Sequence, residues 1–96
     1  MSDKPYKIKD LQYKKALRLN LNIYPSKKKY KKIDVFDKDM KFLASIGDKR
    51  YSDFASYIET DGKEYAENRR RLYRIRHEKT RHKEGTPSWY SDQILW

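Results

Sequence analysis

The sequence has no cysteine, few glycines and prolines, and no long apolar run. The lack of cysteine excludes disulfide bridges and thiolate metal sites. No stretch approaches the roughly 20 apolar residues of a membrane-spanning helix, so we expect no such helix and no membrane partner. The first five residues lead into polar sequence, so we also expect no signal peptide. These absences favour a cytosolic or viral setting.

Large aliphatic side chains are also scarce. Leu, Ile, Val and Phe make up 18 of the 96 residues, which is below the ~20% under which disorder becomes common. Nine tyrosines and two tryptophans act in the opposite direction, because each aromatic ring buries a large area. A chain of this length builds one small core at most. We therefore expect a compact part and a part that is solvated or bound to a partner.

The positive charge is concentrated at one end of the chain, whose formal net charge is +10. Residues 1–32 hold eleven bases and two acids, which gives +9, whereas residues 33–96 hold 13 bases and 12 acids, which gives +1. Like charges repel one another in a compact state, so folding alone gives no reason for this segregation. It predicts a basic arm over residues 1–28, ordered mainly by a partner, before a small domain over residues 29–96. A solvated, disordered tail is the alternative.

Within the arm, residues 17–23 alternate strictly between apolar and polar side chains, which is the pattern of a strand. Pro25 and Ser26 then end the run. A strand with one apolar face has to be covered by its own domain or by another chain, and the sequence leaves both open.

Two further strands are predicted at residues 30–36 and 41–46, around a turn at 37–39, so we expect a β-hairpin. Gly47 ends the second strand and suits a positive φ. The aromatic residues between 51 and 60 show no period and are expected to lie irregularly over the hairpin.

A helix is predicted from residue 63 to about 79, with Asp61 as its N-cap and Glu64 completing a capping box. Thr86 and Pro87 predict the start of a short second helix that runs to about residue 95. The expected fold class is therefore α+β: a small β-hairpin domain with one long helix, a short C-terminal helix and an extended basic N-terminal arm.

The last segment of the sequence is strongly apolar, and it would expose large side chains unless it docks on the core or on a partner. We therefore expect a set of structural anchors on the two helices. They are Tyr73, His77, Trp89, Tyr90, Leu95 and Trp96.

Catalytic and metal-binding patterns are weak. The two histidines, His77 and His82, are too few for a typical zinc site, and a spacing of five residues places them on different faces of a helix. Acid–base catalysis by His77 would need a nucleophile and an orienting carboxylate at defined geometry. We expect no enzyme activity, no metal and no cofactor, and we assign His77 a hydrogen-bonding role at the helix end.

Basic side chains are the main candidates for function. Arginines 69–76 could grip phosphate with their guanidinium forks or pair with nearby acids, and the neutral balance of residues 33–96 favours pairing for most of them. The lysine block at 27–32 fits non-specific phosphate binding or a localisation signal. The candidate polyanion-binding or partner-binding residues are Lys14, Lys15, Arg18, Lys27, Lys28, Lys29, Lys31, Lys32, Arg70 and Arg74.

An ordered set of short motifs runs from residue 46 to the end: Ile-Gly-Asp at 46–48, Tyr-Ser-Asp-Phe at 51–54, the arginine-rich run 69–77 ending in His77, Trp-Tyr-Ser at 89–91, and Leu-Trp at 95–96. With its Lys-rich lead-in, this set resembles a family of small basic proteins of tailed phages and nucleocytoplasmic large DNA viruses. The resemblance covers about residues 30–96. Residues 6–25 depart from it, since they are longer and more apolar than that family's lead-in.

Members of that family have no assigned function, and the phage members tend to be regarded as virion-associated. The resemblance therefore implies a viral structural protein, a capsid-associated, cement or minor virion component found in the virion and, during assembly, in the host cytoplasm. Its basic arm would bind an acidic surface of the major capsid protein or of another virion protein, or packaged double-stranded DNA. The alternative is a non-specific nucleic-acid-binding or packaging accessory protein.

Overall fold

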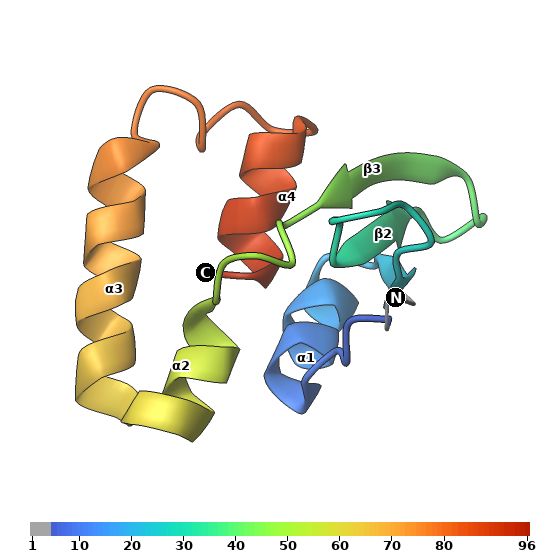
Figure 1. The fold of residues 1–96 in the computed structure, drawn as a ribbon. Helices are drawn as coiled ribbons and strands as arrows, with labels where there is room; N and C mark the ends of the chain where they lie inside the picture. The colour runs from blue at the N-terminus through green and yellow to red at the C-terminus, as the bar shows by residue number, and fades with distance from the viewer. Residues whose placement is uncertain (1–4) are drawn as a thin grey trace.

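The computed structural model describes residues 5–96, and its chain path is drawn in Figure 1. The α+β class is confirmed. Along the chain the elements are α1 (Asp10–Arg18), β1 (Asn22–Pro25), β2 (Ile33–Phe36), β3 (Phe42–Ile46), α2 (Phe54–Asp61), α3 (Lys63–Arg76) and α4 (Pro87–Ile94).

The three strands form an antiparallel sheet in the order β1-β2-β3. Ile23 pairs with Val35, and Ile33 pairs with Ile46, so their apolar side chains meet on one face and are buried in the core. Helix α4 packs against β3, and α1 packs against both α4 and β1. In Figure 1, α4 lies between the sheet and α3, which stands at the edge of the molecule.

The prediction of an extended basic arm is wrong. Residues 10–18 form α1, and β1 pairs with β2 as a third strand, so the domain itself covers this segment. The Cα radius of gyration is 12.9 Å, close to the ~12.5 Å of a folded chain of this length. Residues 1–4 of the predicted arm lie outside the described residues.

The strand predicted at 17–23 is also misplaced, because Leu17 is an exposed residue of α1. Asp10 lies in the first turn of this helix and Lys15 and Arg18 lie in the last turn, which suits the helix dipole. Asn20 then takes a positive φ of 57° and turns the chain into β1. Pro25 is tolerated in β1 because the strand lies at the edge of the sheet.

The stretch expected to be irregular contains α2, which is capped by Asp53: its carboxylate accepts a hydrogen bond from the Ser56 backbone N–H at 2.9 Å. The single long helix is not observed either. Gly62, with a φ of 90°, separates α2 from α3, and α3 ends at Arg76. Asp61 is the last residue of α2, so its predicted capping box with Glu64 is wrong.

The start of α4 is as predicted: Thr86 accepts a hydrogen bond from the Trp89 backbone N–H, and Pro87 occupies the first turn. Gly47 has the expected positive φ, 81°. A Cβ atom at Gly47 would lie 2.9 Å from Leu95 Cδ1 and 3.0 Å from Lys32 Cβ. The close approach of these two side chains therefore requires glycine at this turn.

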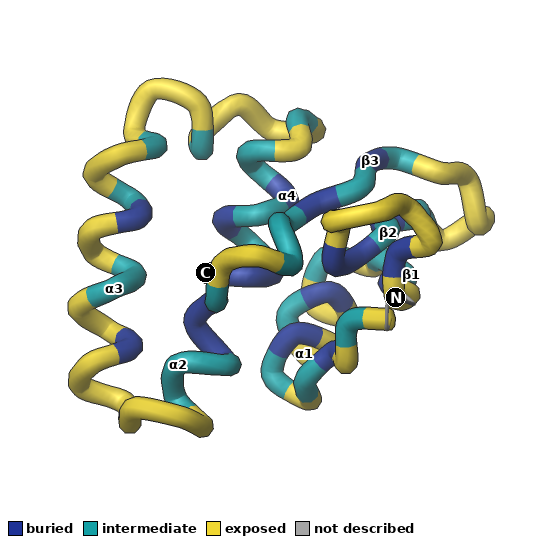
Figure 2. The backbone as a smooth tube through the Cα atoms, viewed as in Figure 1, coloured by how far each residue is buried: buried dark blue, intermediate teal, exposed yellow. Residues whose placement is uncertain are grey.

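The end of the chain is docked on the core. Tyr90, Leu95 and Trp96 are buried, whereas Trp89 is partly buried against them. The ring of Trp96 stacks on that of Tyr73 with centroids 4.5 Å apart. Figure 2 shows that α3 has only scattered buried positions, one of which is Tyr73. The stack therefore helps to hold α3 against the domain.

We expect Trp96→Ala to lower the free energy of unfolding by about 3–5 kcal/mol, because it removes a buried ring and leaves a cavity beneath Tyr73. Ile75→Ala is the control: this α3 side chain is 64% exposed, and its loss should change stability by less than about 0.5 kcal/mol. Urea unfolding of both variants measures the difference. Equal midpoints would show that the stack does not hold α3.

Candidate polyanion interface

The expected surface lysines divide into two groups in the structure. Lys27, Lys28, Lys29 and Lys31 are exposed in the loop between β1 and β2. Lys32 is only 3% exposed, so its predicted role in binding a polyanion at the surface is wrong. Lys32 directly precedes β2 and is buried next to Ile33, and its ammonium group is held inside by the buried carboxylate of Asp53, while Lys31 stays outside.

Lys32 forms a buried ion pair with Asp53, whose carboxylate oxygen lies 2.7 Å from Lys32 Nζ. The Tyr6 hydroxyl donates to the same oxygen at 2.6 Å. Burial alone would raise the pKa of Asp53, but the charge and hydrogen bond of Lys32, with the hydrogen bonds from Tyr6 and the Ser56 N–H, lower it below its ordinary value. The pair is thus fully partnered and belongs to the framework of the fold.

Four other candidates come together from two helices: Lys15 and Arg18 of α1, and Arg70 and Arg74 of α3. We call them the α1–α3 basic cluster. Lys15 Nζ lies 5.2 Å from the centroid of the Phe54 ring, and the Arg70 guanidinium lies 4.2 Å from the same ring. Both cations therefore pack on one buried aromatic side chain at the start of α2.

The cluster holds more positive charge than its neighbours neutralise. Asp92 contacts Arg74 at 3.3 Å and also Arg81 at 3.4 Å, so two arginines share one carboxylate. Burial lowers the pKa of Lys15 to about 8, and the charges of Arg70, Arg74 and Arg18 act in the same direction. The fold thus disfavours the charge on Lys15, which an incoming anion would favour.

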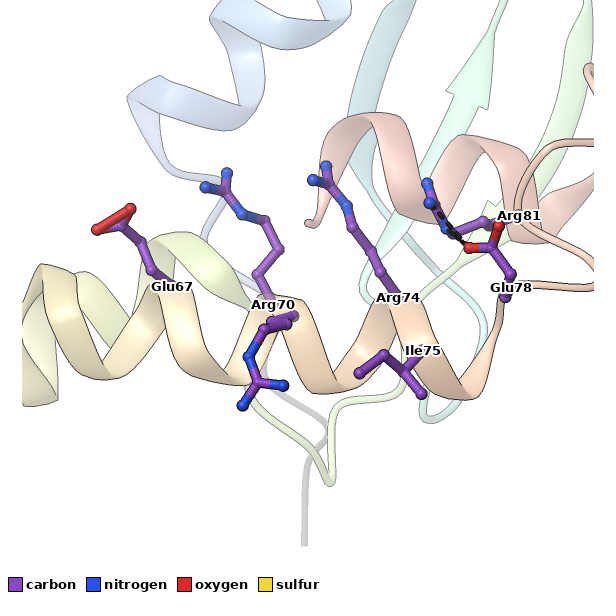
Figure 3. Close-up of a pocket in the computed structure, with 7 residues that line it drawn as sticks. Glu67, Arg70, Arg74, Ile75, Glu78 and Arg81 are labelled. Atoms are coloured by element: carbon purple, nitrogen blue, oxygen red, sulfur yellow. Dashed lines mark hydrogen bonds and ion pairs between the residues drawn. The ribbon is translucent and has the colours of Figure 1, made fainter.

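An open groove of ≈ 600 Å³ runs along this side of α3. Figure 3 shows Arg70 and Arg74 extending from the same side of the helix toward α1 and α4. They are four residues apart, so they lie about one helical turn from each other. Arg81 lies farther along and pairs with Glu78 at 2.9 Å. Arg70 and Arg71 also line the groove, and neither makes an ion pair within residues 5–96.

Lys14 is the remaining candidate on α1, where it is exposed and lies one helical turn before Arg18 of the cluster. The other candidates lie in the loop between β1 and β2. Lys28 Nζ lies over the Phe42 ring at 5.1 Å, and Lys29 Nζ lies over the Tyr30 ring at 5.1 Å. The lysine block is therefore a basic and aromatic loop of its own.

Histidine and carboxylate side chains form no candidate metal centre in residues 5–96. His77 stacks on Tyr73 with centroids 4.4 Å apart, and its backbone N–H caps the end of α3. Burial and the neighbouring Arg76 lower the pKa of His77. In the same described range, no helix is both long and apolar enough to cross a membrane.

Sequence reasoning missed three contributors to the interface: Phe54, Arg81 and Asp92. The i,i+3 spacing of Glu78 and Arg81 was a usable signal for their ion pair. The contact between Arg81 and Asp92 joins the turn after α3 to α4 and has no local signal.

No protein-family model matches the chain, and neither a curated protein nor a solved structure is similar to it at a significant level.

The lowered pKa of Lys15 predicts how stability depends on pH. Between about pH 8 and its ordinary value of 10.5, the unfolded chain holds this proton more tightly than the folded protein does. The folded protein should therefore gain stability relative to Lys15→Met as the pH rises through this range. Because water reaches part of the side chain, we expect a gain of roughly 1–2 kcal/mol, less than the full conversion of the shift. Urea unfolding of both proteins at pH 7 and 10.5 measures it. A difference that stays constant with pH would contradict the electrostatic reading.

Proposed function

We propose that this protein binds the phosphate backbone of nucleic acid through the α1–α3 basic cluster, without reading sequence, as a small capsid-associated or minor virion component. The observation that carries the proposal is the convergence of Lys15, Arg18, Arg70 and Arg74, of which Arg74 alone forms an ion pair among the described residues, with Asp92. A phosphate at the cluster would relieve the repulsion among these cations.

The arrangement suits phosphate better than a base edge. Guanidinium groups present fixed forks of donors that match phosphate oxygens. Arg70 already packs over the Phe54 ring and Arg74 is held by Asp92, so little side-chain freedom is lost on binding. Contacts of this kind position a protein on nucleic acid but carry no sequence information. Binding is therefore expected to be electrostatic and to weaken steeply as salt is added.

The virion setting is supported by the motifs at residues 46–96 that resemble proteins of tailed phages and large DNA viruses. In that setting the polyanion is packaged double-stranded DNA. An acidic surface of the major capsid protein, or of another virion protein, offers the same charge to the cluster. Exposed apolar residues also flank the basic side chains, among them Leu17 of α1 and Ile75 of the groove. They favour a protein surface as an additional contact.

We expect duplex DNA of any sequence to bind, with a log–log salt slope near −5 if about six phosphates are neutralised. The double variant Arg18→Gln/Arg70→Gln should reduce the slope by roughly two and weaken binding equally for all sequences. Fluorescence anisotropy of labelled duplexes over a salt series measures both quantities.

The matched control is Lys38→Gln/Lys41→Gln, which removes the same charge from exposed residues around the turn between β2 and β3. It should keep most of the slope. Equal losses in the two double variants would contradict a localised interface, and no binding at low salt would exclude nucleic acid. In that event, stoichiometric copurification with capsid protein after nuclease treatment decides whether the acidic partner is a protein.

A further inference from the structure

A second cleft, of ≈ 560 Å³, opens between α3 and the loop that joins β3 to α2. Its α3 side is formed by Arg69, Tyr73, Arg76 and His77. At 100° per residue these positions share one side of the helix, about a quarter-turn from Arg70 and Arg74, and they line none of the groove that holds those two arginines. The cleft is therefore separate from the α1–α3 basic cluster. Its volume lies within the usual range for sites that bind small molecules.

One wall of this cleft is aromatic and already fixed in place. The ring of Tyr73 stacks on Trp96 at 4.5 Å with an angle of 10°, and His77 packs against Tyr73 at 4.4 Å. The ring of Tyr57 is the fourth, with its centroid 6.2 Å from that of the Trp96 ring. Because the pKa of His77 is lowered, its ring is neutral at pH 7 and behaves as part of the flat wall. Such a wall favours a planar, aromatic ligand.

The rim of the cleft carries three cations, Lys31, Arg69 and Arg76, and none of them forms an ion pair within the described residues. The acids that line the cleft are already engaged. Asp48 binds Arg50 at 2.8 Å, and Asp53 binds Lys32 at 2.7 Å. The cleft therefore keeps a local excess of three positive charges.

We propose that this cleft binds a nucleoside monophosphate, either free or as the phosphorylated end of a nucleic-acid strand. The phosphate would be held by Lys31, Arg69 and Arg76, and the base would lie along the aromatic wall. A phosphate monoester carries a charge of about −1.5 to −2 at pH 7, which offsets half or more of the positive excess at the rim. An inorganic anion would leave the aromatic wall unused, and a neutral aromatic molecule would leave the cations uncompensated.

The chain offers its own reporter for this site. Trp96 lines the cleft, and Trp89 is the other of the two tryptophans. In a Trp89→Phe background, titration with adenosine 5′-monophosphate should change the Trp96 emission and saturate. Calorimetry on the unmodified chain provides a second measurement that does not depend on that substitution.

Arg76→Gln should weaken adenosine 5′-monophosphate binding by at least about tenfold, because it removes an unpaired guanidinium from the rim. Arg71→Gln is the matched control: it removes the same side chain from the same helix, at a residue that lines the opposite groove. The affinity of Arg71→Gln for adenosine 5′-monophosphate should stay within about twofold of that of the unmodified protein. Circular dichroism establishes that both variants are folded. Adenosine alone and inorganic phosphate alone should each bind at least about tenfold more weakly than the nucleotide.

Two further binding measurements distinguish a nucleic-acid strand end from a free nucleotide as the ligand. A 5′-phosphorylated oligodeoxyadenylate that binds more tightly than both the nucleotide and its unphosphorylated form indicates a strand end. Equal affinity for the nucleotide and the phosphorylated strand indicates a free nucleotide. No binding of adenosine 5′-monophosphate by either method would overturn the proposal, and so would equal binding of inorganic phosphate. Arg18→Gln/Arg70→Gln should leave nucleotide binding unchanged, so this inference can fail independently of the proposed duplex binding.

Discussion

The buried carboxylate of Asp53 is the point on which the rest of the structure depends. One of its oxygens accepts hydrogen bonds from Lys32 and Tyr6, and the other caps α2 through the Ser56 N–H. The Tyr6 hydroxyl in turn bonds Gln12 of α1. A single group thus joins the segment before α1, the start of β2 and the start of α2. Moving two charges out of water costs free energy, and their mutual attraction offsets that cost only while they stay paired. A fold that left either charge buried alone would be much less stable, so the pair favours the one arrangement of these segments in which Lys32 meets Asp53.

This junction also explains how a repulsive cluster of cations can exist on a small domain. Lys15 lies on α1 and Arg70 on α3, and both rest on Phe54, the residue that follows Asp53. Their closeness is set by the core beneath them and not by attraction between them. The folded protein bears the repulsion, which acts together with the larger effect of burial to lower the pKa of Lys15. Because like charges repel one another on this surface before binding, a polyanion that binds there removes an unfavourable interaction.

The sequence predicts the α+β class, the hairpin, the positive φ of Gly47 and the capped start of α4, because each has a local signal in turn, cap or alternation. It does not predict the fate of residues 5–28, because charge that is segregated along a chain need not be segregated in space. Lys31 and Lys32 are identical in type and adjacent, yet Lys32 alone of the two is buried, because its ammonium group pairs with Asp53, 21 residues along the chain. The sequence identifies each member of the α1–α3 basic cluster as a candidate. It does not predict that the four come together, because that depends on the packing between α1, α2 and α3. Asp53 is a typical N-cap residue, and it caps α2. The aromatic residues that follow it show no helical period, so the sequence does not predict this helix.

A double-mutant cycle on Lys32 and Asp53 tests this account most directly, with Lys32→Met and Asp53→Asn measured singly and together by urea unfolding. Each single change leaves a buried charge or dipole without its partner and should cost about 3–5 kcal/mol. The double change should cost much less than the sum of the two, and amide exchange should show α1 loosening in each single variant. Costs that simply add, with α1 unaffected, would show that the ion pair does not organise the fold.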